Sequence, residues 1–372
     1  MFMDTLYRTR IFEPCLELIR KDAILRNKTE NIEDYMDDAE KTLENKIEEG
    51  KLIIPRLVIT TGPRCTLKCT ACANLMAHYE HPYDLDINEI IRDIRRVFSL
   101  IDGCICVNVI GGEPFIYPQL DILLNELIEN DKILYVELTT NGTKIPDDKI
   151  LKILQDKKIV VNISDYGNIT LLSKFVAKMD EYGVISYCIS NEKWIDAGDC
   201  SKRDRNDIQL KKLYGDCESG KLCKTIMKGK IFDCARASSL YDLHYASNLD
   251  YIDLHSENTK KQDVLRFFMK EISNACDYCD FSVLHPKYIE PAEQQNGKKL
   301  NKSQYTVIAR KDYALIVEAK EWWQTQYNNV EKQNAELRDW VKQLEEAKEY
   351  FLGQIANLEK ENQNLRGKNE QI

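Results

Sequence analysis

The sequence lacks any apolar run long enough to cross a membrane. Its first residues, MFMDTLYR, also lack the uninterrupted apolar segment that marks a signal peptide. The first absence excludes a membrane span, and the second argues against export. We therefore expect a soluble, cytoplasmic protein.

An excess of positive charge is also missing. The 372 residues include 52 basic and 61 acidic side chains, for a formal net charge of −9. This balance gives no overall attraction to nucleic acid or to anionic lipid, so we expect no nucleic-acid partner. The length leaves room for two or three domains and a substantial core.

Cysteine, by contrast, is abundant, with 13 copies. An odd number without a secretion signal argues against a disulfide framework and favours metal-bound thiolates in a reducing compartment. Cys65, Cys69 and Cys72 are spaced C-x3-C-x2-C after the apolar run 57–59. Iron–sulfur clusters usually take four thiolates, so three close ones indicate a cube with one iron free of protein ligands. The alternatives are a zinc site with a distant fourth ligand and three unrelated buried thiols.

Strand-like and helix-like segments alternate from about residue 52. Short apolar runs bounded by turn residues predict strands at 56–60, 105–110, 134–139, 159–164 and 184–189. Amphipathic segments between them predict helices at 86–100, 118–130, 147–155 and 170–182. The alternation predicts an α/β fold with parallel strands, in which ligands gather at the carboxyl ends of the strands. The cysteine triplet lies at such an end.

Polar turns follow the next three predicted strands. Glycine lets the backbone approach a ligand closely, and a carboxylate pairs well with an ammonium group. Ordinary turns are the alternative for each residue taken singly. The candidate residues are Gly111, Gly112, Glu113 and Pro114 after the second strand, Asn141 after the third, and Ser164, Asp165 and Tyr166 at the end of the fourth.

The cysteine triplet together with Gly-Gly-Glu-Pro at 111–114 resembles the radical S-adenosylmethionine (radical SAM) enzymes. The resemblance implies a partial (β/α) barrel in which Cys65, Cys69 and Cys72 hold a [4Fe-4S] cluster whose free iron chelates SAM. An electron from the cluster would cleave SAM to methionine and a 5′-deoxyadenosyl radical, which abstracts a substrate hydrogen. One departure is Ala71, because the residue before the third cysteine is usually aromatic in the family.

The resemblance also implies roles for the polar turns. The turn at 111–114 would cradle the SAM amino group, and Asn141 and Ser164 would bond its ribose or carboxylate. Asp165 and Tyr166 would contact substrate, or act as a proton acceptor and its neighbour. The full family core has six strands where five are predicted here, and segment 191–216 has no assignment.

Five more cysteines follow: Cys217, Cys223, Cys234, Cys276 and Cys279. Their spacing around Gly229, which suits a tight hairpin, resembles the twitch domain, the shorter form of the SPASM extension. The resemblance implies one auxiliary [4Fe-4S] cluster. Twitch-type enzymes suggest Cys217, Cys234, Cys276 and Cys279 as its ligands, whereas SPASM-type sites would include Cys223. Zinc is the rival occupant, because C-x2-C pairs suit it well.

The two ends of the chain have helical patterns. Residues 1–50 read as an amphipathic helical arm without assigned chemistry. Apolar residues recur at sevens from Val330 to Leu365, which predicts a coiled coil and homodimerisation through it. The expected domains are an arm at 1–50, a radical SAM core at 51–215, a cluster domain at 216–293, a linker at 294–310 and a coiled-coil tail at 311–372.

The resemblance implies an oxidoreductase that acts on a small, hydroxylated, sugar-like molecule, with the auxiliary cluster accepting an electron from the substrate. A flavodoxin or ferredoxin would supply reducing electrons. One alternative is a peptide or protein maturase of the SPASM or twitch type. A non-catalytic iron–sulfur scaffold is the other, since a shared fold does not fix function.

Overall fold

The computed structural model describes residues 5–26, 31–167, 169–190, 193–295 and 348. The chain divides into two compact units, Met1–Val307 and Ile308–Ile372. Nearly all of the predicted linker and coiled-coil tail lies outside the described residues, so homodimerisation through the tail stays a prediction. Among the described residues, no helix has the length and apolar character needed to span a membrane.

The first unit is built on an eight-stranded sheet with the order β5-β4-β3-β2-β1-β7-β8-β9. Neighbouring strands from β5 to β1, and the pair of β1 with β7, run parallel. The predicted α/β fold is therefore confirmed, with strand ends within three residues of the expected ones. The bounds are β1 Ile53–Thr60, β2 Gly103–Ile110, β3 Ile133–Thr140, β4 Ile159–Asp165 and β5 Ser186–Ser190.

Helices connect the parallel strands, as the amphipathic segments predict. They are α4 Ile87–Leu100, α5 Leu120–Glu129, α6 Asp148–Leu154 and α7 Ile169–Glu181. Helix α4 begins where the Asp86 carboxylate accepts hydrogen bonds from the first free main-chain N–H groups of the helix. Its buried Ile90, Ile94 and Val97 recur at helical spacing and supply one side of the core.

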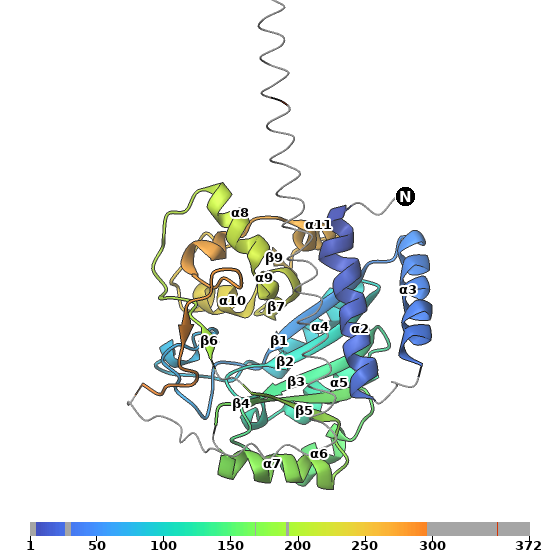
Figure 1. Ribbon diagram of the computed structural model, residues 1–372, viewed down its shortest axis with the longest axis vertical. Helices are drawn as coiled ribbons and strands as arrows, with labels where there is room; N and C mark the ends of the chain where they lie inside the picture. The colour runs from blue at the N-terminus through green and yellow to red at the C-terminus, as the bar shows by residue number, and fades with distance from the viewer. Residues whose placement is uncertain (1–4, 27–30, 168, 191–192, 296–347, 349–372) are drawn as a thin grey trace, which may run out of the picture. The chain divides into compact units, whose positions relative to one another are not determined.

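The amino-terminal segment forms α1 Thr5–Tyr7, a π-helical turn at Arg8–Phe12, α2 Glu13–Leu25 and α3 Ile32–Glu48. In Figure 1, α2 lies across the front of the sheet. Cys15 and Ala23 of α2 are fully buried, so α2 contributes to the core. The sequence predicts an amphipathic arm that packs on the core, but not which strands it contacts.

The cysteine-rich segment extends the same sheet. It contains α8 Asp207–Asp216, α9 Glu218–Leu222, β7 Lys224–Met227, β8 Lys230–Phe232, α10 Ala235–Asp242, β9 Tyr251–Asp253, α11 Lys261–Met269 and a 3-10 turn at Asn274–Tyr278. Strand β7 pairs with β1, and β8 returns antiparallel through a turn in which Lys228 and Gly229 both have positive φ. The expected hairpin at Gly229 is therefore present. Helices α8 to α11 lie at the β7 end of the sheet, and α6 and α7 lie at the β5 end (Figure 1).

Segment 191–216, which the sequence left unassigned, contains α8 and the short strand β6 Trp194–Ile195. Strand β6 pairs antiparallel with β10 Tyr288–Ile289. This second sheet has only two strands, so the sequence shows no strong apolar alternation there.

Candidate functional site

The cysteine triplet occupies the loop that follows β1. Burial raises the pKa of Cys65 to about 12 and that of Cys69 to about 11, and the neighbouring thiols contribute in the same direction. The main-chain N–H of Leu67 donates to Cys65 Sγ at 3.4 Å. Burial also raises the pKa of Cys72, while main-chain N–H groups of residues 74–76 oppose the shift. The three thiols therefore lie within electrostatic reach of one another, and N–H groups donate to their sulfurs.

The glycine-rich turn at 111–114 packs directly against this loop. Gly112 N donates to Gly62 O at 2.9 Å, and Glu113 N donates to Arg64 O at 2.8 Å. A Cβ atom at Gly112 would lie 2.0 Å from Arg64 O and 2.6 Å from Cys65 Cβ. Only glycine fits this contact, which joins the end of β2 to the cysteine loop.

Glu113 links the ends of β2 and β3. Its carboxylate is 1% exposed and accepts hydrogen bonds from Thr140 Oγ1 at 2.8 Å, Asn141 N at 2.9 Å and Phe115 N at 3.1 Å. Burial raises the pKa of Glu113 to about 7 in spite of these donors. Pro114 begins a short 3-10 turn that continues to Ile116. A contact between Glu113 and the SAM amino group stays a prediction, and the protein itself supplies three donors to this carboxylate.

Asn141 is one of the residues that the structure brings to the cysteine loop. Its Nδ2 lies 3.6 Å from Cys65 Sγ and donates to Thr66 Oγ1 at 3.1 Å. The Glu113 carboxylate fixes its main-chain N–H on the opposite side. Asn141 is therefore held between the glutamate and a thiol of the triplet.

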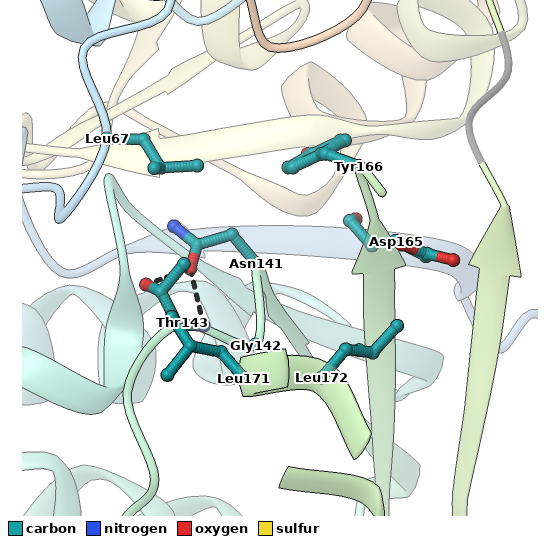
Figure 2. Close-up of a pocket in the computed structure, with 9 residues that line it drawn as sticks. Leu67, Asn141, Gly142, Thr143, Asp165, Tyr166, Leu171 and Leu172 are labelled. Atoms are coloured by element: carbon teal, nitrogen blue, oxygen red, sulfur yellow. Dashed lines mark hydrogen bonds between the residues drawn. The ribbon is translucent and has the colours of Figure 1, made fainter. Parts of the chain in front are cut away.

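A small, partly open pocket lies beside Asn141 and the cysteine loop. It is lined by Leu67, Asn141, Gly142, Thr143, Ser164, Asp165, Tyr166, Leu171 and Leu172. In Figure 2, Leu67 and Tyr166 lie along one side of the pocket and Asn141 and Thr143 along another, whereas Asp165 points away from Asn141. The polar residues predicted at the ends of the third and fourth strands thus share one pocket.

Tyr166 and Asp165 have different surroundings within this pocket. Burial raises the pKa of Tyr166, and the thiols of the triplet add to the effect while Ser164 opposes it through a hydrogen bond. The Tyr166 ring also meets Trp194 nearly edge-on, with centroids 5.3 Å apart. Asp165 accepts a hydrogen bond from Gly167 N at 2.7 Å, which closes the turn after β4. Tyr166 therefore lies within electrostatic reach of the cysteine triplet.

Four of the five distal cysteines lie within electrostatic reach of one another. Burial raises the pKa of Cys276, and the thiols of Cys234, Cys217 and Cys279 raise it further. Each of three sulfurs accepts a main-chain N–H: Cys217 at 3.3 Å, Cys234 at 3.4 Å and Cys279 at 3.4 Å. Cys217 and Cys234 are the N-caps of α9 and α10, where free N–H groups and the helix dipole favour a thiolate.

The fifth distal cysteine, Cys223, lies in a different environment. It adds to the pKa shift of Cys217, yet its hydrogen-bond partner is Arg56 Nη1 of β1 at 4.0 Å. Within the part of the chain that the structure describes, no group of three or more His, Cys, Asp or Glu side chains is arranged to hold a single metal ion.

The structure reveals a buried ionic cluster that the sequence analysis missed. Glu137 of β3 accepts hydrogen bonds from Lys21 Nζ of α2 at 2.6 Å, Arg56 Nη2 of β1 at 3.2 Å and Tyr187 OH of β5 at 2.8 Å. Burial alone would raise the pKa of Glu137, but Arg56 and Lys21 hold it below its usual value. The sequence signal that could have indicated this cluster is a charged residue within each of two otherwise apolar strands, Arg56 in β1 and Glu137 in β3.

The same face of the sheet carries further polar groups. Thr139 Oγ1 of β3 donates to Asn108 Oδ1 of β2 at 3.0 Å. Asn162 lies beside Thr139 in register, and its Oδ1 is buried without a hydrogen-bond partner among the described residues. The face is therefore polar as it approaches the carboxyl ends of the strands.

Gln294 is a second residue that sequence reasoning missed, because it begins the predicted linker. Cys69 and Gln294 form an antiparallel β-bridge, and Gln294 Nε2 donates to Cys69 Sγ at 3.3 Å. Gln294 Oε1 accepts from Lys68 N at 2.7 Å. No local sequence signal indicates such a contact, since the partners are 225 positions apart.

Comparison with known proteins points to one superfamily. Residues 59–164 match the Radical SAM superfamily, and this region includes the cysteine triplet, the turn at 111–114, Asn141 and Ser164. A curated relative, the probable GTP 3′,8-cyclase of Methanococcus maripaludis (strain C6), is 32% identical over 145 residues. The match covers 35% of this chain and 46% of the relative, so the chain spans about half the length of the relative.

Solved structures of radical SAM enzymes also resemble parts of the chain. BtrN in complex with AdoMet and 2-DOIA has a TM-score of 0.41 at 14% identity, covering 67% of this chain and 97% of BtrN. Native anSMEcpe with bound AdoMet and Cp18Cys peptide has a TM-score of 0.30 at 24% identity, covering 36% and 42% of the two chains. Streptococcus suis SuiB bound to S-adenosylmethionine has a TM-score of 0.30 at 24% identity, covering 43% and 39%.

Proposed function

We propose that this protein is a radical SAM oxidoreductase with two [4Fe-4S] clusters. The SAM-binding cluster is held by Cys65, Cys69 and Cys72. The observation that carries the proposal is the packing of the cysteine loop after β1 against the turn at 111–114, where Gly112 N and Glu113 N donate to carbonyl oxygens of the loop, within the region that matches the superfamily.

The donor set around the triplet fits such a cluster. Thiolates are the usual protein ligands of iron–sulfur clusters, and N–H donors to their sulfurs stabilise the anionic form. The N–H donors to the Cys65 sulfur are Leu67 N and Asn141 Nδ2, and the donor to the Cys69 sulfur is Gln294 Nε2. The donors are therefore present on both sides of the loop.

The cluster, when bound, supplies the electron that cleaves SAM to methionine and a 5′-deoxyadenosyl radical, which abstracts a hydrogen atom from substrate. The residues of the chain itself bind SAM and orient it. Glu113 fixes Asn141 against Cys65, and the pocket beside them offers Asn141, Ser164 and Tyr166 to SAM.

Cys217, Cys234, Cys276 and Cys279 are the proposed ligands of the auxiliary cluster. Their mutual proximity and their N–H donors support this set over one that includes Cys223, which contacts Arg56. An auxiliary cluster held by these residues would supply an acceptor for one electron from the substrate radical. The substrate loses first a hydrogen atom and then a proton and this electron, which together make a two-electron oxidation. Asp165 is the proposed proton acceptor.

A small, hydroxylated, sugar-like molecule is the proposed substrate. The support is the polar face formed by Asn108, Thr139 and Asn162 beneath the ends of the strands, where amide and hydroxyl groups suit hydroxyl recognition. A peptide, as bound in one of the similar structures, is the competing substrate in the test below.

The test is SAM cleavage by the anaerobically reconstituted full chain with dithionite. Release of 5′-deoxyadenosine supports the enzyme, and its absence supports the non-catalytic scaffold. Replacing Cys65, Cys69 and Cys72 with alanine should abolish release, whereas Cys276→Ala should leave it partly intact and stop product formation. Product from sugar alcohols supports the proposed substrate class, and product from peptides alone supports a maturase. Zinc in place of iron and sulfide at the triplet would overturn the proposal.

A further inference from the structure

Arg236 is a buried guanidinium with an unusual set of partners. It lies in the first turn of α10, two residues after Cys234, and is 6% exposed. Its hydrogen bonds among the described residues all go to main-chain carbonyl oxygens. They are Gly198 O at 2.9 Å, Asp199 O at 2.8 Å, Ala73 O at 3.4 Å and Tyr278 O at 3.3 Å and 3.4 Å.

Two of these carbonyls belong to the two cysteine groups. Ala73 directly follows Cys72 of the triplet, and Tyr278 directly precedes Cys279 of the distal group. Burial raises the pKa of both thiols, and the charge of Arg236 opposes the shift at each. One side chain therefore touches both loops and lies within electrostatic reach of a thiol from each.

None of the ion pairs among the described residues includes Arg236, although its charge helps to lower the pKa of the exposed Asp199 carboxylate. A buried cation without a directly paired counter-charge is costly. Nearby Arg203 and Arg205 differ, since Asp280 pairs with them at 2.7 Å and 2.5 Å. Clusters ligated by thiolates carry net negative charge, and two of them would supply the missing counter-charge from both sides.

We propose that Arg236 is a positioning residue that ties the loop of the SAM-binding cluster to the loop of the auxiliary cluster, and that its charge raises the reduction potentials of both. The inference rests on the two-cluster function proposed above. A fixed positive charge favours the reduced, more negative state of a nearby cluster, so its removal shifts the potential to more negative values. Because the guanidinium lies between the loops, both potentials depend on it.

Arg205 provides a matched control. Its Nη1 donates to Cys276 O at 2.7 Å and to Cys279 O at 2.9 Å, so it contacts the distal group as Arg236 does. Its described partners include no residue of the triplet loop. Loss of Arg205 should therefore affect the auxiliary cluster alone.

The experiment is a potentiometric titration of the reconstituted full chain, followed by electron paramagnetic resonance. The signals are assigned with Cys276→Ala and with the triple alanine variant of the triplet. In Arg236→Gln we expect both midpoint potentials to shift to more negative values, and in Arg205→Gln only the auxiliary one. Arg236→Lys keeps the charge but cannot reach both loops, so its shifts should be smaller and have the same sign.

Iron content distinguishes the possible failures. If wild-type protein binds clearly fewer than about eight irons per chain, the proposed two-cluster function is wrong. If wild-type protein binds both clusters, the outcome for Arg236→Gln decides the role of Arg236. Midpoint potentials that are unchanged, or shifted only at the auxiliary cluster, overturn that role but leave the two-cluster function standing. If Arg236→Gln does not bind iron, Arg236→Lys decides the matter: a shift at both clusters supports the role, and a shift at one or neither contradicts it.

Discussion

The side-chain amide of Gln294 donates a hydrogen bond to the sulfur of Cys69 at 3.3 Å, across 225 positions of sequence. The backbone supports this contact on both sides, because Thr70 N donates to Glu293 O at 2.8 Å and Gln295 N donates to Lys68 O at 2.9 Å. The segment that follows the distal cysteines thus returns to the triplet loop. Hydrogen bonds to cluster sulfurs raise reduction potentials, so Gln294 should influence the first cluster.

Gln294→Ala should lower the midpoint potential of the SAM-binding cluster. Loss of one hydrogen bond to a thiolate is worth roughly 1–2 kcal/mol, which corresponds to a shift of tens of millivolts for one electron. Potentiometric titration of the reconstituted protein measures it. Gln295→Ala is the control, because its side chain bonds Ala77 O and not a sulfur. Equal potentials in wild type and Gln294→Ala would contradict the expected role.

Gly112→Ala should prevent the triplet from binding its cluster. The added Cβ would meet the Arg64 carbonyl at 2.0 Å and push the cysteine loop away from the end of β2. Iron and sulfide per chain should fall by about half, to those of one cluster. Gly215→Ala is the control, since nothing lies within 4 Å of its Cβ position. Normal loading of Gly112→Ala would show that the loop adapts.

Cys223→Ser and Cys276→Ser should differ in iron content. Cys276 faces three other thiols, whereas Cys223 contacts Arg56. We therefore expect about eight irons per chain in Cys223→Ser and about four in Cys276→Ser. Elemental analysis with sulfide determination measures both. About four irons per chain in Cys223→Ser and about eight in Cys276→Ser would instead indicate that Cys223 is a ligand of the auxiliary cluster and Cys276 is not.

Stability should depend on the ionisation of Glu113. Burial raises its pKa in the folded protein from 4.5 to about 7, so the folded state binds the proton more tightly than the unfolded state between these values. Unfolding then releases a proton, and stability falls as the pH rises from about 4.5 to about 7, by up to roughly 3 kcal/mol. Above pH 7 this contribution is constant.

The Glu113→Gln variant lacks the carboxyl group whose ionisation causes this pH dependence. The free energy of unfolding of wild type relative to this variant should decline from pH 5 to pH 7 and level off above it. Chemical unfolding at a series of pH values measures this difference. A difference that stays flat from pH 5 to pH 8 would mean that the carboxyl group titrates normally.

Lys224→Met should destabilise the fold strongly. Lys224 is fully buried, and its Nζ bonds Tyr214 OH at 2.6 Å, Gly220 O at 2.8 Å and Asp233 Oδ1 at 3.0 Å. Breaking a buried pair from one side costs about 3–5 kcal/mol, and Lys270, which also pairs with Asp233, should keep the loss near the lower value.

Denaturant unfolding measures this loss. The double variant Lys224→Met/Asp233→Asn should regain part of the stability, because it no longer buries the Asp233 charge. Lys211→Met breaks the exposed pair with Glu271 and should change stability by less than about 1 kcal/mol. Similar effects of Lys211→Met and Lys224→Met would contradict the role of burial.

The sequence by itself determined the alternation of strands and helices, and with it the edge of the sheet where the candidate residues gather. The predicted strand at 159–164, for example, corresponds to β4 Ile159–Asp165. Apolar periodicity and turn residues are local signals, and a parallel α/β sheet places all its strand ends on one edge. That is why Asn141 and Ser164 could be assigned to one pocket beforehand.

Only the tertiary structure decided which distant residues meet. It placed Cys223 in contact with Arg56, joined Lys21 to Glu137 across the sheet, and brought Gln294 to Cys69. It also placed Arg236 between the two cysteine loops. Such contacts depend on how elements far apart in the chain pack together, and no residue spacing encodes that packing.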